Sequence, residues 1–263
     1  MMGLKEQRSE KVAIVTGGGS GIGAATAKRL AESGIHVCLL DINYTGADKV
    51  RSDIENSGGG ACIHEVDIRE ERQIEAAIDD IVKKYGRLDV LFCNAGINGT
   101  LSSIEHLDVS DWDRTIETNL RSTFLFVKYS IPHMKENGGS IIITSSINGN
   151  RRFAGFGMAA YSTSKAAQIG FMKMAALELA RYKIRVNAIC PGAIETNIDL
   201  STEKNESVKE IEIPIEYPEG MQPLAKGPGQ PEQVASLVSF LASDESSHIS
   251  GTEIYIDGTE SLL

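Results

Sequence analysis

Short apolar runs alternate with longer amphipathic segments along almost the whole chain. The runs place hydrophobic residues at successive positions, which is typical of strands covered on both faces. The segments between them, such as 21–34, 70–86 and 161–182, repeat apolar residues at helical spacing. The pattern predicts strands at 12–16, 36–41, 62–66, 88–93, 140–145, 184–190 and 252–257.

The alternation of strand and helix predicts one α/β domain over residues 1–263. Parallel strands need crossover connections, and a helix between successive strands supplies them. Right-handed crossovers then give a doubly wound parallel sheet with helices on both faces. The sequence contains no linker or low-complexity tract that would divide the domain.

One irregular stretch, residues 195–230, departs from this alternation. It holds many charges and the prolines Pro214, Pro218, Pro223 and Pro228. A long loop within a compact domain is usually functional. Because the stretch follows the sixth predicted strand, we expect it at the carboxyl edge of the sheet, where such folds bind ligands. We interpret it as a lid over bound substrate.

Composition and charge exclude several classes of function. The 263 residues are 41% hydrophobic and 24% charged, as in an ordinary globular domain. The formal net charge of -10 disfavours binding to nucleic acid or to an anionic membrane. No apolar run reaches the length of a membrane span, and the polar start MMGLKEQRSEK has no signal-peptide core. We therefore expect the partners to be small molecules.

Cysteine and histidine spacing indicates a reduced protein without a metal site. The four cysteines form no CxxC pair and three lie in apolar, strand-like runs, which favours free thiols and a cytoplasmic location. The five histidines are scattered without HxxxH spacing, so we expect no zinc site. These residues are Cys38, Cys62, Cys93, Cys190, His36, His64, His106, His133 and His248.

A glycine-rich turn, Thr-Gly-Gly-Gly-Ser-Gly-Ile-Gly at 16–23, follows the first predicted strand. Glycines allow a tight turn and close approach of the backbone to a pyrophosphate. The helix that begins here offers unpaired N–H groups and positive potential to an anion. The spacing GxxxGxG differs from the common GxGxxG fingerprint, and a glycine-rich surface turn is the alternative interpretation. The candidate phosphate-binding residues are Gly17, Ser20, Gly21, Ile22 and Gly23.

Asp41 ends the second predicted strand, 18 residues after Gly23. A carboxylate at this place accepts hydrogen bonds from an adenosine ribose diol and repels a 2′-phosphate. The next residue is Ile42, and the glycine turn holds no Lys or Arg. We therefore expect NAD(H) to be favoured over NADP(H) as the cofactor. The alternative interpretation of Asp41 is a turn residue at a strand end.

Tyr161 and Lys165 are four residues apart in a helical pattern, so they share one face of the helix. A phenol titrates at about 10 when unperturbed, and a nearby ammonium lowers that pKa. Tyr161 would then serve as a general base for alcohol oxidation or as a general acid for carbonyl reduction. Ser146, at the end of the fifth predicted strand, would hold the substrate oxygen; the alternative is a serine that simply ends a strand.

Two amides stand out in apolar surroundings. Asn119 lies inside an otherwise apolar helix, where a buried amide needs backbone or water partners. Asn94 follows the fourth predicted strand with Ala95 and Gly96, small residues that would let a cofactor cross the sheet edge. A turn is an equally good interpretation of Asn94.

In order and spacing, these residues resemble the short-chain dehydrogenase/reductase family. The resemblance extends from about Lys11 to Gly258, and the joint occurrence of its motifs in order is highly specific. One departure is Cys93, where the family commonly has an Asn. The shared motifs are the turn at 16–23, Asn94-Ala95-Gly96, Asn119, Ser146, Tyr161xxxLys165 and Pro191-Gly192.

The resemblance implies a Rossmann-type fold with a seven-stranded sheet. It implies that Ser146 orients the carbonyl, Tyr161 exchanges the proton, Lys165 binds the nicotinamide ribose and Asn119 holds a relay water. Members are often tetramers, so we expect a homotetramer with interfaces on the helices near 110–135 and 160–182. It also implies cofactor contacts by Asp67 and Ile68 at the adenine, Asn94 at the ribose, and Pro191, Gly192, Ile194 and Thr196 at the nicotinamide.

The loop between Ser146 and Tyr161 is longer than is usual in the family. It carries Arg151 and Arg152, which would receive a carboxylate or phosphate of the substrate. Two solvated surface arginines are the alternative interpretation. Met158, in the same loop, would line a substrate pocket or pack the loop itself.

Three functions are compatible with this sequence. The first is an NAD-dependent dehydrogenase that moves a hydride between nicotinamide and a secondary alcohol or ketone, with a polyol, sugar or hydroxy acid as substrate. The second is an NADP-dependent 3-oxoacyl-carrier-protein reductase, against which Asp41 argues. The third is a protein that senses NAD(H) without turnover, which would not require a complete catalytic tetrad.

Overall fold

The computed structural model describes residues 11–153, 155–214 and 222–263. The polar start of the chain and residues 215–221 of the expected lid lie outside the described residues.

A seven-stranded parallel sheet forms the centre of the fold. Its order is β3-β2-β1-β4-β6-β7-β9, so the strand order reverses between β1 and β4 as in a doubly wound sheet. The predicted α/β fold is confirmed, and each predicted strand matches an observed one to within two residues at either end. The strands are β1 (Val12–Thr16), β2 (His36–Asp41), β3 (Ala61–Glu65), β4 (Val90–Cys93), β6 (Gly139–Thr144), β7 (Ile184–Pro191) and β9 (Glu253–Ile256).

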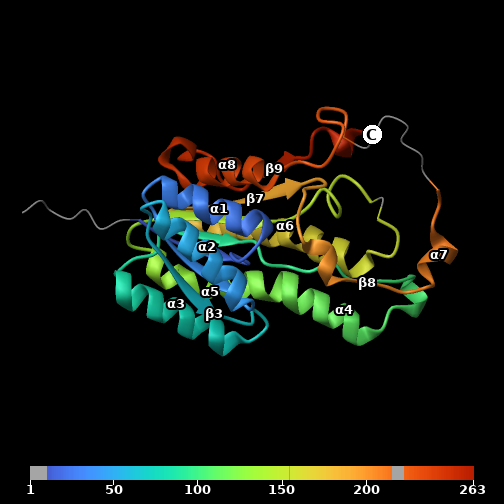
Figure 1. The fold of residues 1–263 in the computed structure, drawn as a ribbon, viewed down its shortest axis with the longest axis horizontal. Coiled ribbons are helices and arrows are strands. Elements are labelled where there is room, and N and C mark those ends of the chain that lie inside the picture. Colours follow the sequence, from blue (N-terminus) through green and yellow to red (C-terminus); the bar gives the residue numbers. More distant parts are fainter. Residues whose placement is uncertain (1–10, 154, 215–221) are drawn as a thin grey trace, which may run out of the picture.

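Helices cover both faces of the sheet (Figure 1), because successive residues of each strand point to opposite sides. Val12 and Ile14 of β1 pack with α3, α5 and α6, whereas Ala13 and Val15 pack with α1, α2 and α8. The strands are apolar on both faces for this reason. The helices are α1 (Gly21–Glu32), α2 (Tyr44–Asn56), α3 (Glu71–Tyr85), α4 (Val109–Ile116), α5 (Ser122–Met134), α6 (Ala159–Leu179), α7 (Val208–Ile211) and α8 (Pro231–Ala242).

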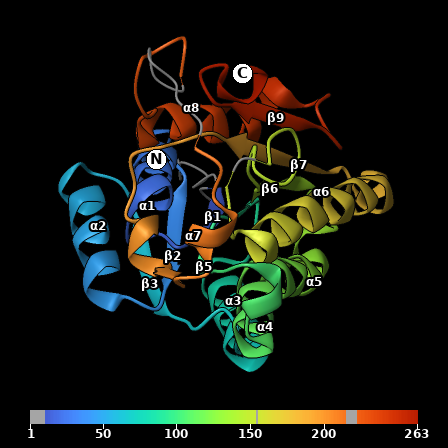
Figure 2. The same cartoon turned by 90° about the vertical axis from the view of Figure 1, so that its right-hand side faces the viewer.

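A small parallel pair of strands, β5 (Gly99–Leu101) and β8 (Thr202–Lys204), lies outside the main sheet. It joins the segment after β4 to the stretch after β7 that the sequence predicts to be irregular. We call residues 195–211 of that stretch the strap; it also contains helix α7. Figure 2 looks toward the carboxyl ends of the main strands and shows β5 and α7 across them. The strap is therefore more regular than the sequence predicts.

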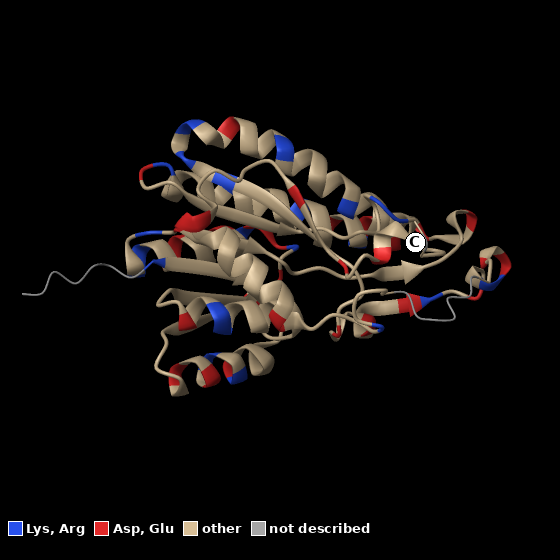
Figure 3. Ribbon diagram, turned by 90° about the horizontal axis from the view of Figure 1, so that it is seen from above, with Lys and Arg blue, Asp and Glu red and all other residues tan. Residues whose placement is uncertain are grey.

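Charge is spread over the outer helices. Figure 3 shows acidic and basic positions interspersed along them, which fits a solvated surface around the covered sheet. None of the helices in the described ranges combines the length and hydropathy that a membrane span requires. All four cysteines are free thiols.

Candidate active site

A cavity of about 990 Å³ opens at the carboxyl edge of the sheet. Its walls come from the segments that follow six of the main strands and from the strap. It includes the point where the strand order reverses, which is where doubly wound folds bind ligands. Most of the predicted contact residues line it, namely Gly17, Ser20, Gly21, Ile22, Asp41, Ile42, Asp67, Ile68, Asn94, Ala95, Gly96, Ser146, Tyr161, Lys165, Pro191, Gly192, Ile194 and Thr196.

The glycine turn at the start of α1 depends on the absence of side chains. Gly17 and Gly21 have φ angles of 66° and 50°, in the left-handed region that favours glycine. A Cβ atom on Gly23 would lie 2.0 Å from the carbonyl oxygen of Gly17. Gly23 does not line the cavity; it allows α1 to pack closely against the turn. The N-terminus of the helix is thereby brought to the cavity wall, where it favours an anion.

Asp41 is held in one orientation at the end of β2. One carboxylate oxygen accepts a 2.8 Å hydrogen bond from the Gly19 N–H, and the other accepts a 2.8 Å bond from the Asn43 N–H. The next residue, Ile42, is apolar and 63% exposed. A fixed negative charge therefore lies beside the glycine turn.

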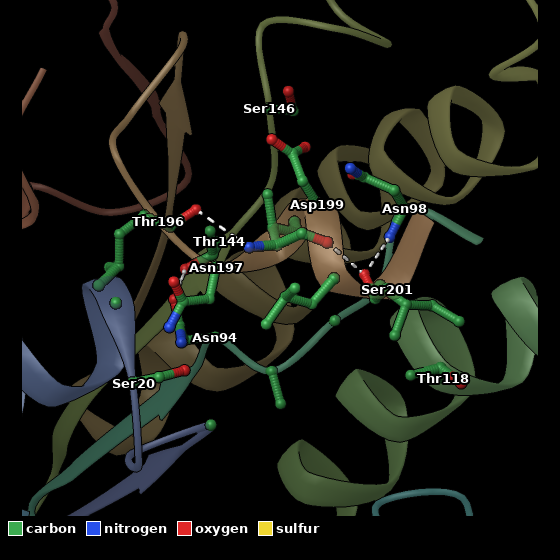
Figure 4. Close-up of a pocket in the computed structure, with 18 of the residues that line it drawn as sticks. Ser20, Asn94, Asn98, Thr118, Thr144, Ser146, Thr196, Asn197, Asp199 and Ser201 are labelled. Atoms are coloured by element: carbon green, nitrogen blue, oxygen red, sulfur yellow. Dashed lines mark hydrogen bonds between the residues drawn. The ribbon is translucent and has the colours of Figure 1, made fainter. Parts of the chain in front are cut away.

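Asn94 joins three strand ends at the floor of the cavity. Its amide nitrogen donates to the Thr16 carbonyl at 3.2 Å, and its amide oxygen accepts from the Thr144 hydroxyl at 3.2 Å. Its backbone N–H donates to the Thr16 hydroxyl at 2.9 Å. The residue is thus more than a turn, because it fixes the ends of β1, β4 and β6 while lining the cavity (Figure 4).

Ser146, Tyr161 and Lys165 meet in the same cavity. The Ser146 hydroxyl lies close enough to Tyr161 to lower the pKa of the phenol. The Lys165 ammonium lies 5.6 Å from the centre of the Tyr161 ring, and it donates a 2.8 Å hydrogen bond to the carbonyl of Thr144. The end of β6 therefore positions both the serine and the lysine relative to the tyrosine.

Burial governs the ionisation of the tyrosine and the lysine. It raises the pKa of Tyr161 above the usual phenol value, against the opposing effect of Ser146. It lowers the pKa of Lys165 to about 8. The expected lowering of the Tyr161 pKa is wrong for the protein alone, because removal of the phenolate from water outweighs the opposing effect of Ser146.

Asn119 lies in a π-helical turn between α4 and α5, a feature frequent at functional sites. Its side chain is fully buried and makes two 2.9 Å hydrogen bonds with the backbone of Ile97, one as acceptor and one as donor. It also donates to the Ser164 hydroxyl at 3.1 Å. It does not line the cavity, and its role as holder of a relay water stays a prediction.

The three residues that were predicted to contact the substrate do not line the cavity. Arg152 forms an ion pair of 2.8 Å with the buried Glu260, and its own side chain is only 10% exposed. The Arg151 guanidinium stacks on the ring of Tyr255 at 3.7 Å, and Met158 lies at the start of α6. The structure thus gives no support to substrate contact. Arg152 is not a solvated arginine, whereas Arg151 is exposed, as the alternative interpretation expects.

Sequence reasoning expected the strap at this edge of the sheet, but apart from Thr196 it named none of the strap residues that line the cavity. The backbone N–H of Asn98 donates to the Ser201 hydroxyl at 3.2 Å, and the Asn98 side chain donates to the Thr202 hydroxyl at 2.9 Å. Figure 4 shows Asp199 and Ser201 in this part of the cavity, with the Asp199 carboxylate directed toward Ser146. Strands of three residues carry no periodicity, so the sequence offers no signal for the pairing of β5 with β8 that forms this wall.

The residues present fit a nicotinamide dinucleotide. The glycine turn and helix N-terminus suit a pyrophosphate, and Asp41 suits a ribose diol. Small-molecule sites usually have volumes of about 300–1,000 Å³. A cavity of about 990 Å³ therefore has room for a dinucleotide and a small substrate together.

Known proteins with similar sequence and structure are oxidoreductases. A family model described as Enoyl-(Acyl carrier protein) reductase matches residues 17–259. A cyclohexanol dehydrogenase from Acinetobacter sp. (strain SE19) is 37% identical over 256 residues, which cover 97% of this chain and 96% of that relative. The crystal structure of a 3-ketoacyl-ACP reductase from Sinorhizobium meliloti 1021 is 44% identical, with a TM-score of 0.90 over 95% of this chain and 99% of that one. A 3-ketoacyl-(acyl-carrier-protein) reductase from Brucella melitensis, crystallised with NADH, is 31% identical, with a TM-score of 0.83 over 95% of this chain and 98% of that one.

Proposed function

Because this chain belongs to the short-chain dehydrogenase/reductase family, and is thus an NAD(P)-dependent oxidoreductase acting on alcohols or ketones, we propose that it interconverts a neutral secondary alcohol and its ketone with NAD(H). The observation that carries the proposal is the joint presence of Ser146, Tyr161 and Lys165 in one cavity with Asp41 beside its glycine turn. The first three suit proton exchange at a substrate oxygen, and the fourth suits an unphosphorylated ribose.

In this mechanism Tyr161 exchanges a proton with the substrate oxygen while Ser146 donates a hydrogen bond to the same oxygen. A bound nicotinamide supplies the hydride chemistry at the carbinol carbon. Lys165 stabilises the phenolate form of Tyr161 through its charge, from a position fixed by the Thr144 carbonyl. Asn119 holds the backbone of Ile97 in place. By resemblance to the family, it also holds a water molecule that continues the proton relay.

The preference for NAD(H) rests on charge near the glycine turn. The Asp41 carboxylate, which two backbone N–H groups hold in place, would repel a 2′-phosphate. Arg69 also lines the cavity, but its guanidinium pairs with Asp67 at 2.6 Å. The Brucella relative crystallised with NADH supports the same cofactor in a similar fold.

The preference for a neutral substrate rests on the strap. Three carboxylates of this segment, Glu195, Asp199 and Glu203, line the cavity. Arg114 lines it too, and its guanidinium pairs with Glu203 at 3.1 Å. An acidic substrate would meet repulsion here. A polyol, a sugar or a cyclic alcohol therefore fits better than a hydroxy acid, and the cyclohexanol dehydrogenase relative supports this class.

The second candidate function is reduction of a 3-oxoacyl group on a carrier protein, which the Sinorhizobium relative favours. Initial rates with a panel of cyclic alcohols, polyols, hydroxy acids and 3-oxoacyl thioesters, each with NAD(H) and NADP(H), separate the two. We expect turnover of neutral alcohols with NAD⁺ at least 10-fold above NADP⁺. Faster turnover of the thioester with NADPH would replace our proposal.

A role as an NAD(H) sensor is tested by Tyr161→Phe. We expect a 10²- to 10⁴-fold loss of kcat, typical of a general acid/base, with unchanged NAD⁺ affinity. Tyr129→Phe, which changes a partly buried tyrosine paired with Glu71 outside the cavity, is the matched control and should keep full activity. If Tyr161→Phe preserved the biological activity of the protein, the sensor function would be correct.

We also propose that the chain forms a homotetramer. Phe124 on α5 and Met174 and Leu177 on α6 are large apolar side chains that are 47%, 55% and 73% exposed. Helix faces of this kind are typical of subunit contacts. Light scattering of the purified protein should give four times the mass of 28.4 kDa; the mass of one chain would contradict the proposal.

A further inference from the structure

Two thiols and two imidazoles share one side of the sheet edge, outside the cavity. His36 and Cys38 are two residues apart on β2, and Cys62 and His64 are two residues apart on β3. A period of two puts each pair on one side of its strand. The strand register places Cys38 directly opposite Cys62. The structure therefore gathers residues whose spacing in the sequence gave no indication of a metal site.

The ligand atoms of this cluster are close together. The potential metal-binding atoms of His36, Cys38 and Cys62 all lie within 4.8 Å of one another, and the two sulfurs are 2.8 Å apart. His64 and Tyr85 lie near the Cys62 sulfur, and His64 is outside this set of three. The Tyr85 ring, from the end of α3, also packs on the His36 ring with 4.3 Å between centroids. Tyr85 thus closes the cluster on the helix side.

The cluster is buried in apolar surroundings and leaves one polar atom without a partner. Cys38 and Cys62 belong to the apolar core between the sheet and α3, beside Ile14 and Leu40. The Nε2 atom of His36 is fully buried there, and no hydrogen-bond partner for it occurs in the described parts of the chain. A buried nitrogen without a partner is destabilising unless a ligand satisfies it.

We propose that His36, Cys38 and Cys62 bind one Zn²⁺ ion in a site that joins β2 to the edge strand β3, with His64 supporting the Cys62 thiolate from outside the ligand set. Two thiolates and one imidazole are common zinc ligands. The fourth tetrahedral position is left to a water molecule. The two thiols release their protons when the ion binds.

The geometry accommodates the ion after a small movement. Bonds of about 2.3 Å from zinc to each sulfur separate the sulfurs by about 3.8 Å in a tetrahedral site. The two thiols therefore swing apart by about 1 Å from their 2.8 Å contact. Because β3 is the edge strand and Cys62 and His64 are only partly buried, the ion can enter from solvent.

The test is metal binding by the purified full-length protein under reducing conditions. After loading with Zn²⁺ and exhaustive dialysis, elemental analysis should give one zinc per chain. Loading with Co²⁺ should give the charge-transfer absorption of cobalt bound to thiolate. Cys62→Ser should abolish both signals. His64→Ala, a milder change at a partly buried position, should weaken Zn²⁺ affinity at least 10-fold.

The matched control is Cys93→Ala, which removes a buried thiol from β4 and should retain the zinc. Circular dichroism and dehydrogenase activity establish that each variant folds. Zinc retention by Cys62→Ser equal to that of the unmodified protein would overturn the proposal. So would absence of bound zinc in the unmodified protein, or a peptide mass showing that Cys38 and Cys62 form a disulfide under these conditions.

Discussion

At the residue scale, burial sets the protonation of the reactive groups. The raised pKa of Tyr161 keeps the phenol neutral at pH 7, so the form needed for alcohol oxidation becomes more populated as the pH rises. The lowered pKa of Lys165, about 8, means that its charge is lost when the pH rises through that value. Oxidation of the alcohol should therefore become faster as the pH rises, until loss of the Lys165 charge above about 8 limits the increase, and ketone reduction should depend on pH in the opposite sense.

The first prediction concerns Lys165→Met, which removes the positive charge near Tyr161. Without that charge, the apparent pKa of the group that must lose a proton for alcohol oxidation should rise by about one unit, equivalent to about 1.4 kcal/mol. The measurement is the pH profile of kcat/KM. Lys173→Met removes an exposed lysine of the same helix, paired with Glu253, and should leave the profile unchanged. Equal profiles for both variants would contradict the role of Lys165.

The second prediction concerns Asp41→Asn, which removes the charge beside the glycine turn and keeps the shape of the side chain. The ratio of kcat/KM for NADP⁺ to that for NAD⁺ should rise at least 10-fold, since repulsion of a 2′-phosphate is relieved. Asp48→Asn, on the neighbouring helix α2, is the matched control. An unchanged ratio in Asp41→Asn would show that another group selects the cofactor.

At this scale, the role of a residue could be predicted when the residues that define it are its neighbours in the chain. The glycine turn and Asp41 are recognisable because a strand end, a turn and a helix start follow one another directly in the chain. The contacts of Arg151 and Arg152 were not predictable, because their partners, Tyr255 and Glu260, come from the far end of the chain. No spacing rule relates two such distant segments.

At the element scale, Glu260 links three segments around the cavity. Its carboxylate accepts hydrogen bonds from Arg152 at 2.8 Å, from the Ala193 N–H at 2.9 Å and from the Gln222 side chain at 3.0 Å. The loop after β6, the loop after β7 and the C-terminal turn are thereby joined. Because the Ala193 segment lines the cavity, the C-terminal turn supports the site from outside.

The third prediction follows from the burial of this pair. Arg152→Ala leaves the Glu260 charge buried without the guanidinium and should destabilise the protein by about 3 kcal/mol. Thermal unfolding should show a Tm lower by about 6 °C or more. Arg29→Ala breaks an exposed pair with Glu32 and should change the Tm by about 2 °C at most. Similar losses in both variants would mean that the Arg152 pair contributes no more than a surface pair.

The elements differ in how far the sequence specifies them. The main strands were predictable because apolar runs of four or more residues are required where both faces are covered. The pair β5 and β8 was not, since it depends on backbone hydrogen bonds between two polar three-residue segments more than 100 residues apart. The cluster around Cys38 and Cys62 was also not predictable from the sequence, because only the register of β2 and β3 brings its residues together.

At the scale of the whole molecule, the cavity depends on segments from almost the entire length of the chain. The residues that line it extend from Gly17, after the first strand, to Pro228, near the start of α8. A ligand that contacts all of these segments stabilises the folded state of the whole domain. Cofactor binding should therefore be visible as a change in global stability, independently of turnover.

The fourth prediction is that NAD⁺ raises the Tm of the protein. At a concentration of 100 times its Kd, a ligand that binds only the folded state adds about 2.7 kcal/mol. For a domain of this size the Tm should rise by about 5 °C or more.

NADP⁺ at the same concentration should give a smaller shift, because Asp41 opposes its 2′-phosphate, and Asp41→Asn should remove the difference. Tyr161→Phe should retain the NAD⁺ shift while losing activity, which separates binding from chemistry. Equal shifts with both cofactors in the unmodified protein would contradict NAD⁺ selection by Asp41.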